Sequence, residues 1–143
     1  HPQEYVVNIR TISAHDNMVA INGALSVDLT GQIASESIGP RMYTGSGGQP
    51  SFAIGSMLSK GGRSIIMLRS TSNDGNVSRI TSCLDAGTIV TVPRNFADYI
   101  VTEFGIASLL GKSQRERAQE LIAIAHPDFR SELERQARKL FWP

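Results

Sequence analysis

Two patterns of hydrophobic and polar positions divide this chain of 143 residues near position 112. Before that point, apolar residues form short runs between glycine-containing turns, and this spacing is typical of strands. After it there is no glycine, and residues 113–142 are rich in Glu, Arg, Gln, Ala and Leu, which favour helices. Together the patterns predict an α/β fold: an open sheet with few helices, followed by a helical pair at the C-terminus.

The predicted strands are short apolar runs that lie between turn signals. A hairpin is predicted over residues 27–33, because Thr30-Gly31 is a turn signal between two apolar segments. The run Ser64–Leu68 is apolar after its serine and lies between two arginines, which favours a strand buried on both faces. Strand-like residues begin at Tyr5, and the remaining predicted strands are 18–21, 77–80, 88–92 and 99–102.

Helical signals occur in the middle of the chain and at its end. Residues 49–59 carry Pro50 near their start, which predicts a short helix that ends at Lys60-Gly61-Gly62. Ser113 and Glu116 have the spacing of a capping box at the start of a second helix. The apolar face expected for this second helix consists of Ala118, Leu121, Ile122 and Ala125.

A break at residues 126–128 separates the second helix from a third. The third helix is predicted to begin at Pro127 or Asp128, because proline is favoured in a first helical turn. Its expected apolar face consists of Phe129, Leu133, Ala137, Leu140 and Phe141.

Composition narrows the class of protein. The formal net charge is +1, which argues against nucleic-acid binding through a broad cationic surface. No apolar run approaches the roughly 20 residues that span a bilayer, and no secretory signal is present, so we expect a soluble cytoplasmic domain. The chain has one cysteine, Cys83, in an apolar context that predicts an inert buried thiol, and no Cys/His cluster has zinc spacing, so no metal is expected.

The segment Gly45–Gly48 is the first candidate for chemistry. Three glycines in four residues allow a ligand to approach the backbone, and the helix that follows offers unpaired N–H groups to a phosphate, a carboxylate or a thioester oxygen. A tight structural turn explains the same residues equally well. Lys60 and Arg63 are cations that could pair with phosphates, although two solvated side chains are the simpler interpretation.

Nucleophile motifs are absent from the sequence, and two carboxylates remain as candidates. No G-x-S-x-G elbow is present. Glu36 and Glu103 lie in apolar or glycine-bearing segments, where burial would raise the pKa of either carboxyl; a hydrogen-bonded structural role is the alternative. From the residues alone, the chain is an α/β domain with a glycine loop that binds an anion or a cofactor.

Several blocks together resemble the C-terminal domain of the acetyl-CoA hydrolase/transferase family, which includes acetate and 4-hydroxybutyrate CoA-transferases. The resemblance covers about residues 5–135, in the family's order. The blocks that carry it are NMVAINGALSVDLTGQIASESIG, GSGGQPSFAIG, SKGGRSIIML and IVTEFGIASLLGKSQRERAQELIAIAHPDFR.

The resemblance implies that residues 1–143 are a fragment of a longer two-domain enzyme with an open α/β architecture. Such an enzyme moves CoA between a short-chain acyl-CoA and a carboxylate through a glutamyl-CoA thioester, with coenzyme A as co-substrate. The family's nucleophilic glutamate lies upstream, outside this chain. Glu103, in T-E-F-G, resembles the E-x-G of a sister branch, but its block matches a different family segment.

The resemblance also assigns site residues. Gly47 and Gly48 would supply backbone donors to the thioester oxygen, with Gly45, Gln49 and Phe52 shaping the wall beside CoA. Lys60 would approach the phosphates or the pantetheine of CoA. Asn8 is a further candidate, because YVVN resembles an upstream segment that carries an active-site asparagine.

One departure and two alternatives accompany this assignment. Pro50-Ser51 follow Gln49 where many relatives have an aspartate, so a contact by an acidic side chain is not carried over. An acyl-CoA hydrolase would use the same glutamyl intermediate, and a non-catalytic CoA-binding module is the alternative outside enzymes. The expected partners are the N-terminal domain of the same protein and a second subunit in a homodimer.

Overall fold

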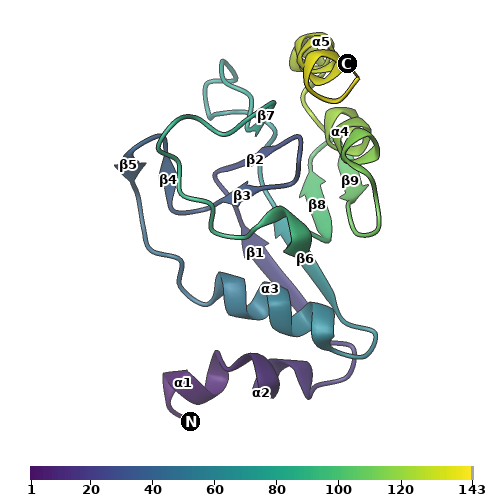
Figure 1. Cartoon of the computed structure of the whole chain (residues 1–143). Helices are drawn as coiled ribbons and strands as arrows, with labels where there is room; N and C mark the ends of the chain where they lie inside the picture. The colour runs from purple at the N-terminus through teal and green to yellow at the C-terminus, as the bar shows by residue number, and fades with distance from the viewer. Residues whose placement is uncertain (143) are drawn as a thin grey trace.

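A computed structural model describes residues 1–142. It is a mixed α/β structure in which a four-stranded sheet carries helices on one side (Figure 1). Its elements, in chain order, are α1 (Gln3–Val6), α2 (Ile9–Ser13), β1 (Val19–Gly23), β2 (Ser26–Asp28), β3 (Ile33–Ala34), β4 (Ser37–Ile38), β5 (Arg41–Met42), α3 (Gln49–Leu58), β6 (Arg63–Met67), β7 (Ile80–Thr81), the 3₁₀ turn η1 (Arg94–Phe96), β8 (Tyr99–Thr102), β9 (Gly105–Ser108), α4 (Gln114–Ala123) and α5 (Pro127–Phe141).

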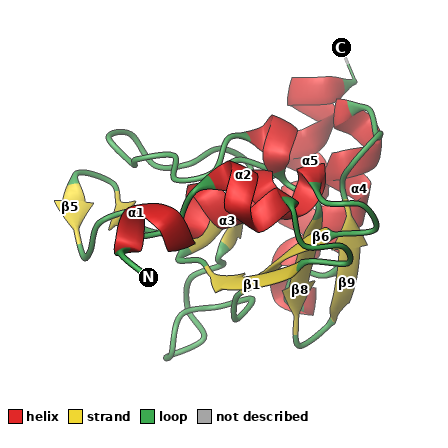
Figure 2. Cartoon of the chain, turned by 90° about the horizontal axis from the view of Figure 1, so that it is seen from below, coloured by secondary structure: helices red, strands yellow, loops and turns green. Residues whose placement is uncertain are grey.

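The main sheet has the strand order β1-β6-β8-β9. β1, β6 and β8 are parallel, and β9 returns antiparallel to β8. Helix α3 packs against β1 and β6, while α4 packs against β9 (Figure 2). The chain therefore forms a β1–α3–β6 crossover, the connection that parallel strands require.

Two smaller sheets are formed largely by the long connection between β1 and α3, with β7 added from the segment after β6. β2 pairs antiparallel with β3 and parallel with β7, so the predicted hairpin around Thr30-Gly31 is confirmed. β4 and β5 form a separate two-stranded ribbon. Val27, Leu29 and Ile33 are fully buried and join the core beneath α4, which extends the core beyond the main sheet.

Helices α2 and α3 approach closely because a glycine lies between them. A Cβ at Gly55 would lie 2.6 Å from Cγ2 of Ile12, so no side chain fits there. Ile12 is buried at this contact. The absence of a side chain at Gly55 thus lets α2 lie directly on α3, and Figure 2 shows the two helices overlapping.

The C-terminal helices follow the predicted signals. Ser113 and Glu116 form the capping box in both directions, and all four predicted apolar positions of α4 and its end are buried. Arg117 is also buried, and its guanidinium donates to the carbonyls of Thr30 and Arg94. α5 begins at Pro127 as expected, although Leu140 on its predicted apolar face is exposed.

Three expectations about elements are wrong, one strand was missed, and only Ile80 of the predicted strand 77–80 belongs to a strand. The residues from Tyr5 form the helices α1 and α2, not a strand. Residues 88–92 contribute only an isolated bridge between Val92 and Ile33, because Ile89 and Val90 point into solvent. β9 was not predicted. Within the strand predicted to be buried on both faces, Met67 is half exposed.

The single cysteine is also placed differently from the prediction. Cys83 is exposed, because its segment leaves β7 and runs over the surface. An exposed thiol does not fit the expected inert buried one. None of the helices in residues 1–142 is long and apolar enough to cross a membrane.

Candidate functional site

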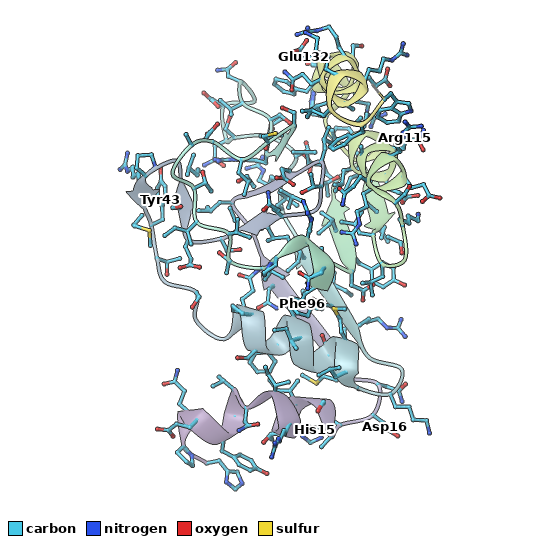
Figure 3. All side chains as sticks on the ribbon, viewed as in Figure 1. His15, Asp16, Tyr43, Phe96, Arg115 and Glu132 are labelled. Carbon is cyan, nitrogen blue, oxygen red and sulfur yellow. The ribbon has the colours of Figure 1, made fainter. Side chains whose placement is uncertain are left out.

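The glycine loop Gly45–Gly48 connects the β4–β5 ribbon to the first residue of α3. In Figure 3 the chain runs from Tyr43, at the outer end of the ribbon, to the start of α3, and the loop forms this stretch. Gly47 has φ +54°, a left-handed conformation, and Gly48 is the N-cap of α3. The loop is exposed except for Gly48, which is half buried.

Four consecutive backbone amides in this loop are without acceptors. Within residues 1–142 the N–H groups of Gly45, Ser46, Gly47 and Gly48 donate to no protein oxygen, whereas those of the preceding Tyr43 and Thr44 donate to the carbonyl of Glu36. A Cβ at Gly45 or Gly47 would meet nothing within 4 Å. The arrangement can hold an anion or an oxyanion by backbone N–H groups at the positive end of a helix.

The loop lies beside the carboxyl end of β1. Gln49 Nε2, at the start of α3, donates to the carbonyl oxygen of Gly23 at 3.2 Å, and Ser35 Oγ donates to the same oxygen at 3.1 Å. Gly23 is the last residue of β1. In open α/β sheets, ligands bind outside the carboxyl ends of the strands, so this is the expected edge for a site.

Gln49 and Phe52 both lie in the first turn of α3, directly after the loop. Gln49 is buried, and its amide ties the start of α3 to the sheet. The Phe52 ring lies where a Cβ at Gly48 would contact it at 3.1 Å, and Val7 would lie 3.4 Å from the same point. Both side chains hold the loop's final residue in place.

Asn8 lies near the loop through its neighbour Val7, but its side chain already has a partner. Its Oδ1 accepts from the backbone N–H of Arg10 at 2.9 Å and caps α2. The side chain therefore caps the helix that packs against α3, the helix that carries Phe52. This position supports a structural role for Asn8 and leaves its part in binding a prediction.

Lys60 lies at the other end of α3 from the loop. The ten residues of α3 separate them by about 15 Å. Lys60 is exposed, and its carbonyl accepts from the N–H of Asn17 at 2.8 Å, beside the end of α2 where Figure 3 labels His15 and Asp16. Gly45, Gly47 and Gly48 thus form one group with Gln49 and Phe52, and Lys60 is not part of it.

The two candidate carboxylates have different surroundings. Glu36 is half buried beside the loop, where its backbone carbonyl accepts from Tyr43 and Thr44. Glu103 is exposed in the turn between β8 and β9, and accepts from the backbone N–H of Ser70 at 3.0 Å and from its Oγ at 2.7 Å.

The hydrogen bonds determine the protonation of Glu103. Burial acts to raise the pKa of its carboxyl, but the hydrogen bonds from Ser70 and the charge of Arg69 outweigh burial, and the net pKa lies below the ordinary value. The raised pKa that burial would cause is not found at Glu103, and its hydrogen bonds from Ser70 agree with the structural alternative. A carboxylate whose oxygens already accept two hydrogen bonds is a poor nucleophile, and this one joins two loops. No group of three or more metal-ligating side chains occurs in the part of the chain that the structure describes.

Comparison with known proteins adds to this geometry. Residues 1–137 match the model of the acetyl-CoA hydrolase/transferase C-terminal domain. The chain belongs to this family. It is 52% identical over 138 residues to the 4-hydroxybutyrate coenzyme A transferase of Clostridium kluyveri, which covers 96% of this chain and 32% of that protein. It is 48% identical over 141 residues to the butyryl-CoA:acetate CoA-transferase of Anaerostipes caccae, with 96% and 32% covered.

Solved structures of this family share the fold. The crystal structure of RipA from Yersinia pestis superposes with a TM-score of 0.88 at 48% identity, over 96% of this chain and 31% of that one. The 4-hydroxybutyrate CoA-transferase of Porphyromonas gingivalis superposes with a TM-score of 0.80 at 41% identity, over 99% of this chain and 31% of that one. The chain thus spans about a third of the length of the relatives it matches.

Sequence reasoning missed two residues at the anchor of the glycine loop of this acetyl-CoA hydrolase/transferase domain, and a third residue elsewhere. The carbonyl of Gly23, at the end of β1, accepts from Gln49 and from Ser35, while Ser70 donates to Glu103 between β8 and β9. Small polar residues in loops carry no distinctive signal in a single sequence. Only their contacts, made over as many as 33 positions of the chain, distinguish them.

Proposed function

We propose that this chain is the part of a CoA-transferase that holds the acyl-CoA thioester, in an enzyme that moves CoA between a short-chain acyl-CoA and a carboxylate. The observation that carries the proposal is the set of four amides at Gly45–Gly48 that have no acceptor within residues 1–142, beside the carboxyl end of β1. They lie in the block GSGGQPSF, through which the sequence resembles the family's glycine loop.

The chemistry requires an oxyanion site of this kind. A glutamate carboxylate attacks the thioester carbonyl, the C–S bond breaks, and CoA leaves as the thiolate from an acyl-glutamyl anhydride. The thiolate then attacks the glutamyl carbonyl, which releases the carboxylate product and leaves a glutamyl-CoA thioester. Each attack places negative charge on a carbonyl oxygen, and preorganised N–H donors stabilise that charge.

The residues of this chain would take distinct roles in those steps. The amides of Gly47 and Gly48 donate to the developing oxyanion, while Gln49 and Phe52 keep them in place against the sheet. Lys60, about 15 Å away along α3, would meet only a distal part of the CoA molecule. The nucleophilic glutamate is supplied by a part of the protein outside this chain, since the oxygens of Glu103 are held by Ser70.

A coupled assay on the complete protein tests the proposal. Incubated with acetyl-CoA and butyrate, it should form butyryl-CoA and acetate in equal amounts, with a glutamyl-CoA adduct that mass spectrometry detects after acid quench. The 143 residues alone should give no turnover. Turnover by this chain alone would contradict the placement of the nucleophile elsewhere.

The same assay separates the alternative activities. A hydrolase is supported by the acetyl-CoA hydrolases of two yeasts, which are 31% and 33% identical to this chain, below the 43–52% of five transferases and similar to the 33% of the succinyl-CoA:acetate CoA-transferase of Clostridium kluyveri. A hydrolase would release free CoA whether or not a carboxylate acceptor is added. A CoA-binding module would bind acetyl-CoA and form neither product. We further expect the protein to be a cytoplasmic homodimer, which gel filtration with light scattering tests.

A further inference from the structure

Helices α4 and α5 lie side by side at one end of the molecule, and a groove lies between them (Figure 1). We define the α4–α5 groove as this cavity of about 740 Å³, with Ile122 of α4 and Ala137 of α5 at its floor. Both floor residues are buried. The groove is therefore a concave surface with an apolar floor, of the kind that receives another molecule.

The side chains that α5 contributes to the α4–α5 groove form one row along the helix. Arg130, Glu134 and Arg138 follow one another every four residues, and Trp142 comes four residues later, directly after the helix. Residues at this spacing form a continuous ridge, and the packing of two such ridges is the commonest contact between helices. The row has the order cation, anion, cation, indole, so its charges alternate.

The charges of this row are not neutralised within the described chain. Glu134 has an arginine four residues before it and another four residues after it, a spacing that permits ion pairs on one helix. Within residues 1–142 its carboxylate nevertheless forms no ion pair, whereas the nearby Glu132 pairs with Arg135. The guanidinium of Arg138 likewise donates no hydrogen bond in this part of the chain. The row thus offers a carboxylate and a guanidinium to a partner.

The order of the row is self-complementary. If a second α5 lies antiparallel to the first about a two-fold axis at position 136, position 134 of each copy faces position 138 of the other. Glu134 then meets Arg138 twice, once in each direction. At the ends of the row each Arg130 faces a Trp142 ring, which attracts a cation. A two-fold interface requires this reciprocity, because the same surface contributes from both sides.

We propose that the α4–α5 groove is the surface through which two copies of this chain associate, with α5 of each copy lying antiparallel in the groove of the other. The four helices then form a bundle around the two-fold axis, and the apolar floor of each groove is covered. A second copy fits the charges better than a small anion does, because an anion bound by the two arginines would meet the carboxylate of Glu134 between them.

This inference goes beyond the proposed function, and it gives a surface to the homodimer expected there. The glycine loop precedes α3, and Figure 1 shows α3 and α5 at opposite ends of the molecule. Association through the α4–α5 groove therefore leaves the amides of the glycine loop open to acyl-CoA.

Charge reversal in the complete protein tests this interface. Glu134→Arg brings like charges together across the two-fold axis, and Arg138→Glu does the same, because each substitution alters both reciprocal pairs. A mixture of the two variants restores both pairs, since two arginines of one copy then face two glutamates of the other. Like charges remain within each helix, so recovery in the mixture comes only from contact between copies. Glu132→Arg and Arg135→Glu are the matched controls, because this exposed ion pair does not line the groove.

The expected result in sedimentation over a dilution series is that each reversal raises the dissociation constant of the homodimer at least about a hundredfold. The control variants should change it by less than about fivefold. When the two reversal variants carry different tags and are co-expressed in equal amounts, native mass spectrometry should find more than about nine in ten dimers to be mixed.

Four outcomes would overturn the proposal: an unsubstituted protein that is monomeric, reversal variants with unchanged affinity, variants that dissociate but do not recover in the mixture, and mixed dimers at the proportion expected by chance. Recovery in the mixture also shows that both variants are folded. The transferase assay on the same samples separates the two ideas. An active protein whose variants dimerise unchanged refutes only the interface, and an inactive protein whose variants dissociate and recover refutes only the proposed function.

Discussion

Two glycine-rich segments flank α3, and the structure uses their glycines differently. At the C-terminal end, a Cβ at Gly62 would lie 2.1 Å from the carbonyl oxygen of Ser56, and one at Gly61 would lie 2.5 Å from Asn17 Oδ1. At the N-terminal end, a Cβ at Gly45 or Gly47 would meet nothing within 4 Å. The first pair is packed against its own chain, and the second faces empty space.

The difference separates a structural glycine from one that a ligand requires. Packing explains Gly61 and Gly62 completely. Neither packing nor a positive φ explains Gly45, whereas a Cβ at Gly48 would already lie 3.1 Å from the Phe52 ring. The remaining reason for a glycine at position 45 is the approach of another molecule to the backbone, which the four amides without acceptors within residues 1–142 also indicate.

The largest expected effect is a loss of stability from a substitution at Gly62, after the C-terminal end of α3. Gly62→Ala inserts a methyl group into a backbone contact that cannot shift cheaply, so we expect it to lower the free energy of unfolding by about 3 kcal/mol or more. Urea unfolding of the complete protein measures this. Gly45→Ala is the control, with a change within about 0.5 kcal/mol. Equal stability of the two variants would contradict the distinction between packed and unpacked glycines.

The next largest effect is expected on the rate of glutamyl-CoA formation, from a substitution in the glycine loop before α3. Gly48→Val in the complete enzyme places a side chain beside the amides and against Phe52, so we expect glutamyl-CoA formation to slow by about 10²–10³-fold. Melting temperature and single-turnover rate are measured on the same sample. The fold should persist, because the Phe52 ring can shift. An unchanged rate would remove the loop from the active site, and a parallel loss of stability and rate would make it a structural turn.

A smaller effect concerns the pH dependence of stability. Because the folded pKa of Glu103 is lowered, its charge stabilises the fold above the unfolded pKa near 4.5, and that stability is lost as the pH falls through the folded pKa. Glu103→Gln should lower the free energy of unfolding at pH 7 by less than about 1 kcal/mol. The variant should also lose less stability than the unsubstituted protein as the pH falls below about 4.5. It should keep turnover. Loss of all turnover would identify Glu103 as the nucleophile.

The smallest effect is expected at Lys60. It is exposed and about 15 Å from the loop, so Lys60→Ala should raise the KM for acetyl-CoA by less than about fivefold, which corresponds to the 0–1 kcal/mol of a solvated charge pair. Steady-state kinetics at two salt concentrations measure it. A larger, salt-sensitive increase would show that this end of α3 contacts CoA phosphates and would make both glycine segments part of one binding surface.

The sequence predicted the elements whose signals are local. The capping box at Ser113, the hairpin at Thr30-Gly31 and the helix after the glycine loop each depend on neighbours within a few positions. The helices α1 and α2 could not be predicted in this way. Val6 and Val7 favour a strand, but the Asn8 cap and the contact of Ile12 with Gly55 outweigh this local preference.

The site was predicted in part. The position of the loop at a helix start follows from three glycines before a proline. That its amides lack acceptors, and that Gln49 turns inward to Gly23, depends on contacts between distant residues. The error on Cys83 has the same origin: Ile80, three residues before it, is buried in β7, but the strand ends at Thr81, before the cysteine.

The buried guanidinium of Arg117 connects α4 to two distant segments of the chain. It remains charged although burial lowers its pKa, and its donors are satisfied by carbonyls of the β2–β3 turn and η1. If any one of these segments opened alone, it would leave a charge desolvated without its acceptor, at a large cost in free energy. The change in composition near residue 112 is thus no boundary in folding: the strand region and the helical pair should exchange their slowest amide hydrogens together, as one cooperative unit.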